Sequence, residues 1–275
     1  MMRYIKLVNF EINRFSKIYL SLLLITLVSQ FAGVFIVTKS LLNDARDIMK
    51  EERLSEAAYI TNYGGIDFNH IANSLLFVGP IALSAVALIF YIFLIWYRDW
   101  FGKNTFIYRL LMLPTSRLSI YLSKATSIFL MVLGLIAFQI IILPMENALF
   151  NSNVPQALLS EMSISTITIA NPILSLIIPS TFTQFLISYG IGLMIMSILF
   201  TAIMFERSFR LKGIIMGLLY CGIAAVLFLA PVLMEIGNFY FYPNELFGLM
   251  LAIGIILTGL SVWLGAWLLK NRVTV

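Results

Sequence analysis

Long apolar stretches, separated by short polar segments, dominate the pattern of the chain. A membrane-spanning helix needs about 20 mainly apolar residues, because about 30 Å of hydrocarbon is crossed at about 1.5 Å per residue. Five stretches satisfy this requirement without interruption, at residues 18–38, 74–97, 125–145, 213–234 and 246–269. Each of them is predicted to be a transmembrane helix.

A sixth span is predicted within a longer uncharged stretch, Met162–Phe205. As one helix this stretch would be about 66 Å long, roughly twice what a bilayer requires. Asn171-Pro172 and Pro179 interrupt its first half, since proline removes a backbone donor and disfavours helix in the residue before it. The pattern therefore predicts one span at about 183–205, preceded by a broken interfacial or re-entrant segment.

The residues before the first span show a helical period of their own. Tyr4, Val8, Ile12 and Phe15 recur every three or four positions, while basic residues fall mostly elsewhere around the helix. This period is typical of an amphipathic helix that lies in the membrane interface. A charged anchor that leads directly into the first span is the alternative.

The polar segments between the spans differ in length. Residues 39–73 and 146–182 form two loops, and the first contains apolar residues at helical spacing that predict a short helix ending near Gly64-Gly65. Residues 97–124 form the largest loop on the other side of the membrane. The chain is interpreted as a single transmembrane domain over residues 1–275.

Composition and charge agree with this organisation. Of the residues, 61% are hydrophobic and 11% charged, against about 25% charged in soluble domains. Six spans place fourteen of the eighteen Lys and Arg residues on the side of both termini, and ten of the thirteen acids on the other side. By the positive-inside rule both termini and residues 97–124 are cytoplasmic, and residues 39–73 and 146–182 are external. A water-soluble globule, a disordered tail and a nucleic-acid-binding domain are excluded.

Few side chains point to chemistry. One histidine, His70, cannot form a multi-histidine metal site, and one cysteine, Cys221, cannot form an internal disulfide. The chain contains no G-x-x-x-x-G-K-[ST] phosphate loop. The predicted spans lack ionisable side chains, since Glu146 and Glu235 fall only at their external ends. We therefore expect no catalytic residue, metal site or cofactor in this chain.

Other polar and small residues suggest helix packing. Gln30, Gln139 and Gln184, within or near the spans, are typical of interhelical hydrogen bonds, with a substrate contact as the alternative. Gly213 and Gly217 form a G-x-x-x-G step, which lets helices approach closely in lipid. They predict either packing within the bundle or a dimer contact.

The loop at 97–124 combines basic and aromatic residues. Its first part contains Arg98, Asp99, Trp100, Phe101, Lys103, Phe106, Tyr108 and Arg109. Large aromatic side chains beside arginine are typical of anchors in protein interfaces. An aromatic belt at the membrane surface is the alternative interpretation.

The end of this loop resembles a known family. Leu110-Leu111-Met112-Leu113-Pro114-Thr115-Ser116-Arg117, followed by Lys124, is similar to the loop of ABC type-2 transporter permeases, which reads LL-x-LP-[VTS]-S-R with a lysine about seven residues later. Members of that family have six spans, an amphipathic N-terminal interface helix and a coupling helix between spans two and three. The residue-level resemblance covers about 28 residues, and the topology covers the whole chain.

The resemblance implies the membrane subunit of an ATP-driven exporter in the cell membrane, by analogy the bacterial cytoplasmic membrane. Residues 98–108 would be the coupling helix, and Pro114, Ser116 and Arg117 would fix the turn into the third span. ATP and Mg²⁺ would bind a separate ABC ATPase subunit, and a second permease, identical or paralogous, would complete the dimer among the membrane lipids. An amphipathic or hydrophobic substrate, such as a peptide, lipid or antimicrobial, would cross at the dimer interface.

Two other classes of function stay open. One is a non-transporting sensor or immunity module with the same fold, and the other is an ion-coupled carrier. A neighbouring gene for an ATPase without membrane spans would favour the transporter over both.

Overall fold

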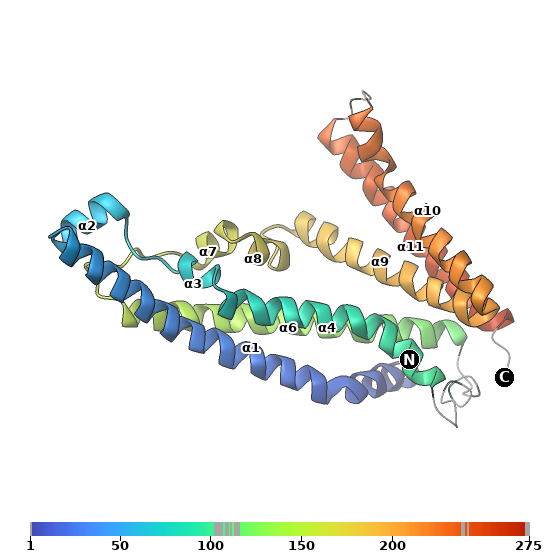
Figure 1. Cartoon of the computed structure of the whole chain (residues 1–275). Coiled ribbons are helices and arrows are strands. Elements are labelled where there is room, and N and C mark those ends of the chain that lie inside the picture. The colour runs from blue at the N-terminus through green and yellow to red at the C-terminus, as the bar shows by residue number, and fades with distance from the viewer. Residues whose placement is uncertain are drawn as a thin grey trace. The chain divides into compact units, whose positions relative to one another are not determined.

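The structure is a computed structural model that describes residues 2–101, 107, 110, 112, 116–237, 240 and 242–272. The described chain is 87% helical and contains no strand (Figure 1). Six of its helices are long and apolar enough to cross a membrane. They are α1 (Met2–Glu51), α4 (Leu75–Trp100), α6 (Arg117–Asn153), α9 (Phe182–Phe209), α10 (Leu211–Ile236) and α11 (Pro243–Asn271). The prediction of an all-α, multi-pass membrane protein is confirmed.

Helix α1 is longer than its predicted span at both ends. It has 50 residues and is continuous from the N-terminal amphipathic stretch through the span and beyond Thr38. Its sequence contains no proline and a single glycine, Gly33, so nothing breaks the helix before Glu51. The predicted interface helix is therefore not a separate element but the first part of α1. The first third of the predicted loop at 39–73 is likewise helical.

The chain forms two compact units. Unit 1 comprises Met1–Arg14, Leu88–Met131 and Phe182–Val275, and unit 2 comprises Phe15–Ala87 and Val132–Thr181. Unit 2 contains nearly all of the two loops predicted to be external. Unit 1 contains the loop at 97–124 and both chain ends. The orientation of the termini across a membrane stays a prediction.

In unit 2 the two polar loops pack against each other through four short helices. These are α2 (Glu56–Tyr63), α3 (Asn69–Ala72), α7 (Ile164–Ala170) and α8 (Pro172–Ile177). The amide of Ile66 donates to the carbonyl of Leu158 (2.8 Å), and the amide of Ser160 donates to the carbonyl of Ile66 (3.0 Å). Phe68, completely buried, lies edge-on to Phe150 in the apolar core of this unit. Helix α2 ends at Tyr63, and Gly64 is its C-cap. The apolar residues on which the short helix of this loop was predicted, Leu41 to Met49, belong instead to α1, which ends at Glu51.

The break before the fourth span lies where proline predicted it. Asn171 separates α7 from α8, and its side-chain oxygen accepts from the amides of Ile173 and Leu174, both at 3.0 Å. Asparagine is a preferred N-cap, and Pro172 is well placed at the first helical position. The side-chain amide of Asn171 also donates to the carbonyl of Ala72 (3.0 Å), which fixes the break to α3.

Within unit 1, α9 and α10 form a tight hairpin joined by Arg210 alone. Arg210 has φ 55° and ψ −128°, a conformation that costs a side-chain-bearing residue backbone energy. A Cβ on Gly213 would lie 2.1 Å from the carbonyl oxygen of Phe205, and one on Gly217 would lie 3.0 Å from that of Ala202. Both glycines therefore serve helix packing within the chain, against α9. The alternative of a dimer contact at these two positions is not supported.

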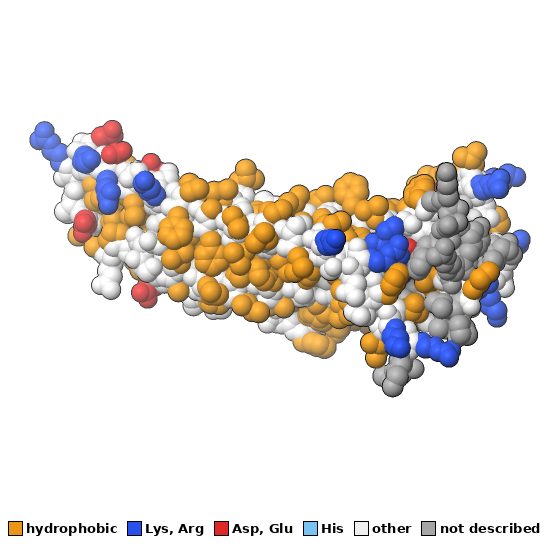
Figure 2. Space-filling view, turned by 90° about the horizontal axis from the view of Figure 1, so that it is seen from below, with side chains coloured by type: hydrophobic (Ala, Val, Ile, Leu, Met, Phe, Trp, Pro, Cys, Tyr) orange, Lys and Arg blue, Asp and Glu red, His pale blue; other side chains and the backbone are white. Residues whose placement is uncertain are grey.

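The surface of the helices is strongly apolar. Large hydrophobic side chains are exposed on α10, among them Leu218 (68%), and on α11, among them Trp263 (63%). Figure 2 shows hydrophobic side chains gathered on the visible face, with most acidic and basic side chains outside that area. Such a surface suits a lipid environment and agrees with six membrane-spanning helices.

Candidate functional site

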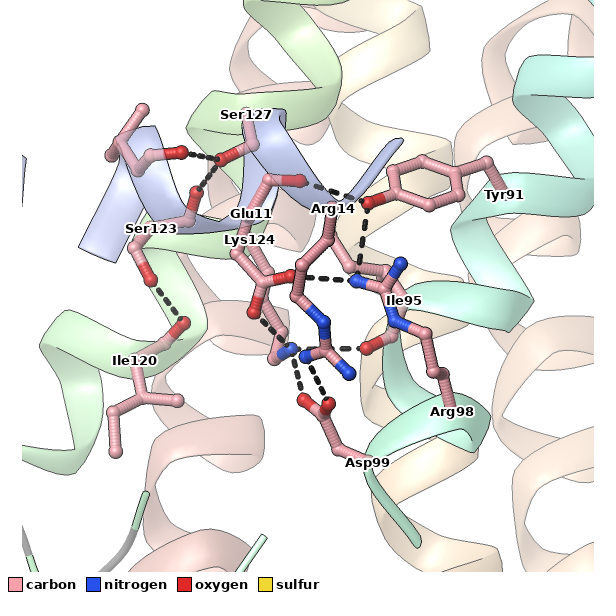
Figure 3. Close-up of polar contacts among 11 residues, drawn as sticks. Glu11, Arg14, Tyr91, Ile95, Arg98, Asp99, Ile120, Ser123, Lys124 and Ser127 are labelled. Carbon is pink, nitrogen blue, oxygen red and sulfur yellow. Dashed lines mark hydrogen bonds and ion pairs between the residues drawn. The ribbon is translucent and has the colours of Figure 1, made fainter. Parts of the chain in front are cut away.

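Three helices of unit 1 bring five charged side chains together. Glu11 and Arg14 come from α1, Arg98 and Asp99 from the last turn of α4, and Lys124 from the second turn of α6 (Figure 3). We call these five residues the ion cluster. Glu11 and Arg14 share one face of α1 because they are three residues apart. The cluster holds two carboxylates and three cations.

Lys124 is the centre of the ion cluster. Its ammonium donates to Oε1 of Glu11 (2.6 Å), to Oδ2 of Asp99 (2.5 Å) and to the carbonyl oxygen of Ile95 (3.0 Å). The side chains of Lys124 and Asp99 are completely buried, and that of Glu11 is 3% exposed. An ammonium has three donors, so all of them are used. Lys124 thereby joins α1, α4 and α6 at one point.

The two arginines complete the cluster from its edge. Nη1 of Arg14 contacts Oδ1 of Asp99 at 2.6 Å, and Nη2 of Arg98 contacts Oε2 of Glu11 at 3.0 Å. The phenol of Tyr91 donates to the backbone carbonyl of Glu11 (3.4 Å). Each carboxylate oxygen therefore has a cationic partner, which is the condition under which buried charges are tolerated.

A second set of contacts connects the end of α4 to the end of α9. The phenol of Tyr97 donates a short hydrogen bond to Glu206. The guanidinium of Arg207 lies 4.5 Å from the ring centre of Tyr97 and 5.6 Å from that of Trp100. Cation–π contacts of this kind favour a fixed arrangement of arginine and ring. We call Tyr97, Trp100, Phe101, Glu206 and Arg207 the arginine–aromatic cluster.

The described part of the loop between α4 and α6 packs onto the same unit. Ile107 and Leu110 are buried together with Ile120 of α6, and Leu7 of α1 and Trp100 pack against them. At the end of the loop, the hydroxyl of Ser116 accepts from the amide of Ser119 (3.3 Å) and caps α6. Ser116 is therefore the N-cap of α6.

Arg117, predicted only to fix the local turn, also reaches a distant element. Its Nη1 donates to the carbonyl oxygens of Leu269, in a short contact, and of Lys270 (3.3 Å) at the end of α11. Carbonyls at a helix C-terminus lack partners within the helix, so a guanidinium there is favourable. Pro114, the third residue of the predicted turn, lies outside the described residues.

Four of the eight residues predicted to couple to an ATPase are described. Arg98 and Asp99 belong to the ion cluster and are directed into the protein, which makes them supports of the loop and not exposed contacts. Trp100 is partly buried, and Phe101 is 70% exposed. Of these four residues, Phe101 is therefore the most exposed to a partner. Lys103, Phe106, Tyr108 and Arg109 lie outside the described residues.

Sequence reasoning missed the role of Glu11. The N-terminal stripe was assigned to Tyr4, Val8, Ile12 and Phe15, but Glu11 lies on the buried stripe and is 2% exposed, whereas Ile12 is only partly buried. The spacing of 4, 8, 11 and 15 is as helical as the one chosen. A carboxylate on an otherwise apolar face was the available signal, but its partners are 87 and 113 residues away.

Gln30 and Gln139, predicted to make interhelical contacts, bond to each other in unit 2. The amide of Gln30 donates to the side-chain oxygen of Gln139 (3.1 Å) and to the carbonyl of Phe77 (3.2 Å). This confirms the packing interpretation for these two residues.

Comparison with known proteins identified no relative: no family model, curated protein or solved structure matches the chain. The six apolar helices define a multi-pass membrane protein. Any more specific function is a proposal from the residues themselves.

Proposed function

We propose that the chain is the membrane-spanning subunit of an ATP-driven transporter, with ATP hydrolysed by a separate subunit that docks on the loop between α4 and α6. The single observation that supports this proposal best is the ion cluster at the base of that loop. It holds the last turn of α4 and the start of α6 to α1 through charge pairs in which Lys124, Asp99 and Glu11 are buried. The loop sequence, similar to that of ABC type-2 permeases, suggests the kind of partner.

A loop that transmits force needs a stiff base. Asp99 lies two residues before Phe101, and Lys124 lies eight residues after the cap Ser116, so their contact closes the loop. Buried, hydrogen-bonded charge pairs keep one arrangement, because separating them leaves an unpaired charge in an apolar environment. A displacement of the loop by a partner would then move the ends of α1, α4 and α6 together. This is the mechanical link that the proposal requires between ATP hydrolysis and the membrane helices.

Phe101 is the described residue best suited to contact the partner. It is 70% exposed, it stacks on Tyr97 at a ring-centre distance of 6.0 Å, and it lies 5.8 Å from the guanidinium of Arg207. Because the contacts with Tyr97 and Arg207 already restrict the ring, it loses little further conformational freedom when a partner covers its exposed face. Aromatic anchors of this kind cost about 2 kcal/mol or more when truncated, roughly a thirty-fold loss of affinity.

Copurification tests the proposal. The tagged chain is extracted from its native membrane in mild detergent, and ATPase activity and mass spectrometry identify what is retained. We expect a soluble ATPase on the wild-type chain and at least tenfold weaker retention on Phe101→Ala, roughly the loss of one anchor. Phe182→Ala is the matched control, because Phe182 is a similarly exposed phenylalanine (74%) at the start of α9.

Two results would contradict the proposal. If no ATPase is retained by a wild-type chain that is folded and inserted, the transporter assignment fails. If an ATPase is retained equally by Phe101→Ala, Phe182→Ala and the wild type, Phe101 does not anchor the ATPase, and the proposed docking contact fails.

A further inference from the structure

One acidic side chain in unit 2 is buried without a partner. Glu146 lies on α6, seven residues before its end at Asn153, and is completely buried. Unit 2 is described in full, and neither carboxyl oxygen of Glu146 has a hydrogen-bond partner there. The sequence suggested that Glu146 lies only at an external span end. The structure places it among apolar side chains instead, because Leu143 and Phe150, on the same face of α6, belong to the core of the unit.

Other buried polar atoms without partners lie at the same level. Gln30 of α1 meets Gln139 of α6, and both helices continue in the same direction through unit 2 (Figure 1). Thr38 lies eight residues after Gln30 on α1, and Glu146 and Asn147 lie seven and eight residues after Gln139 on α6. Because the two helices run in the same direction, this register places Thr38 at the same height as Glu146 and Asn147. The hydroxyl of Thr38 and the side-chain oxygen of Asn147 are buried and have no hydrogen-bond partner in unit 2.

No cation of unit 2 can balance an ionised Glu146. Within unit 2, the other charged residues and the histidine of α1 (from Phe15 onward), α2, α3 and the connecting segments are exposed, except Asp67, which is partly buried and pairs with His70. They are Lys17, Lys39, Asp44, Arg46, Asp47, Lys50, Glu51, Glu52, Arg53, Glu56, His70 and Glu161. Helices α7 and α8 and the part of α4 in unit 2 carry no charged residue. The phenols of Tyr19 and Tyr59 are the remaining titratable groups that are at least partly buried.

An ionised carboxylate in such a place is very unfavourable. Burial of an ion without a countercharge costs several kcal/mol even after the protein relaxes around it, and the group responds by becoming neutral. A proton is the smallest ligand that neutralises a carboxylate, and it needs no cavity. The acid formed is uncharged and needs no cationic partner, so it can remain among the apolar side chains of the core.

We propose that Glu146 is a proton-binding site, occupied by one proton in the packed form of unit 2 and emptied when α1 and α6 separate enough to admit water. The site thereby couples the opening of this interface to the proton concentration on the side from which water enters. The proposal stands independently of any ATPase partner.

A hydrophobic carbodiimide tests the proton directly, because it reacts with a protonated carboxyl group in an apolar environment. The purified wild-type chain in detergent is treated with dicyclohexylcarbodiimide and analysed by peptide mass spectrometry. We expect an adduct on Glu146 that declines as the pH is raised. Glu11 is the matched control, because it is equally buried but ion-paired with Lys124 and Arg98, and it should not react.

The result that would overturn the proposal is the absence of an adduct on Glu146 at every pH at which the chain is folded. Protection of Glu146 by sodium ions at constant pH would also overturn it, since a metal cation would then be the ligand.

A stability measurement gives a second, independent test. Glu146→Gln keeps the shape of the neutral acid and cannot ionise. The wild type should lose thermal stability as pH rises, because its unfolded state releases the proton more easily than its folded state. Glu146→Gln should lack that part of the pH dependence and be the more stable protein at high pH. Identical pH profiles for the two proteins would contradict the proposal.

Discussion

Replacing Lys124 by methionine removes the centre of the ion cluster while keeping a long apolar side chain in its place. In the variant, Oε1 of Glu11 and Oδ2 of Asp99 lose their shared donor and remain buried. Arg98 and Arg14 still hold the other oxygen of each carboxylate. The two remaining pairs join α1 to α4 only, so α6 loses its connection to the ion cluster.

The cost follows from the hydrogen bonds that methionine cannot form. A hydrogen bond to a charged group contributes about 1.5–3 kcal/mol, and Lys124 makes two such bonds to carboxylates. Breaking a buried ion pair by removing one partner costs about 3–5 kcal/mol, and we expect Lys124→Met to fall in that range. For a chain of this size the melting temperature should fall by on the order of 10 °C.

Thermal unfolding of the purified chain in detergent measures this effect, with Lys39→Met as the control. Lys39 is an exposed lysine of α1, and its replacement should change stability by about 0.5 kcal/mol at most. The double variant with Asp99→Asn adds a sharper test. In Lys124→Met, the two carboxylates that shared one ammonium face each other. Adding Asp99→Asn to this variant should therefore lower the free energy of unfolding by about 1–3 kcal/mol less than Asp99→Asn lowers it in the wild type. Additive costs, or equal melting temperatures for Lys124→Met and Lys39→Met, would refute the reasoning.

Further predictions concern the hairpin and the topology. Gly213→Ala should destabilise the chain by about 1–3 kcal/mol, because the new methyl group meets the backbone of α9. Gly222→Ala, which has open space around it, is the control and should not destabilise the chain; melting temperatures in detergent compare the two. Arg210→Gly should stabilise the hairpin by about 1 kcal/mol in the same assay, since glycine adopts a positive φ without strain, and a loss of stability would contradict this. In a cysteine-free background, cysteines at Asn62 and Lys212 should be labelled by an impermeant maleimide from opposite sides of the membrane, Asn62 from outside; labelling of both from outside would exclude the six-span orientation.

The apolar pattern of the sequence was sufficient to predict the six long helices, because each is specified by its own residues. The break at Asn171 and Pro172 was predictable for the same reason, since an N-cap and a proline act locally. The continuation of α1 to Glu51 was not recognised, although the segment has no helix breaker. Polar composition was taken there as a sign of a loop.

The contacts of the ion cluster could not be predicted, because they join residues that are far apart in the chain. Asp99 and Lys124 were recognised as parts of one loop and its following span, but Glu11 was not singled out. Arg117 was assigned a local role, while its partners Leu269 and Lys270 lie on the last helix. Charge counting also cannot distinguish a solvated basic residue from one that is completely buried.

The measurement that tests the central claim most directly is photo-crosslinking in living cells. A benzophenone amino acid is placed at Phe101, at the start of the loop, and for comparison at Phe182, which is equally exposed on α9. Adducts are purified through a tag on the chain and identified by mass spectrometry. The account predicts a crosslink from position 101 to a soluble ATPase and none to that protein from position 182. A folded, inserted chain that gives no ATPase adduct at position 101, or equal adducts at both positions, would contradict it.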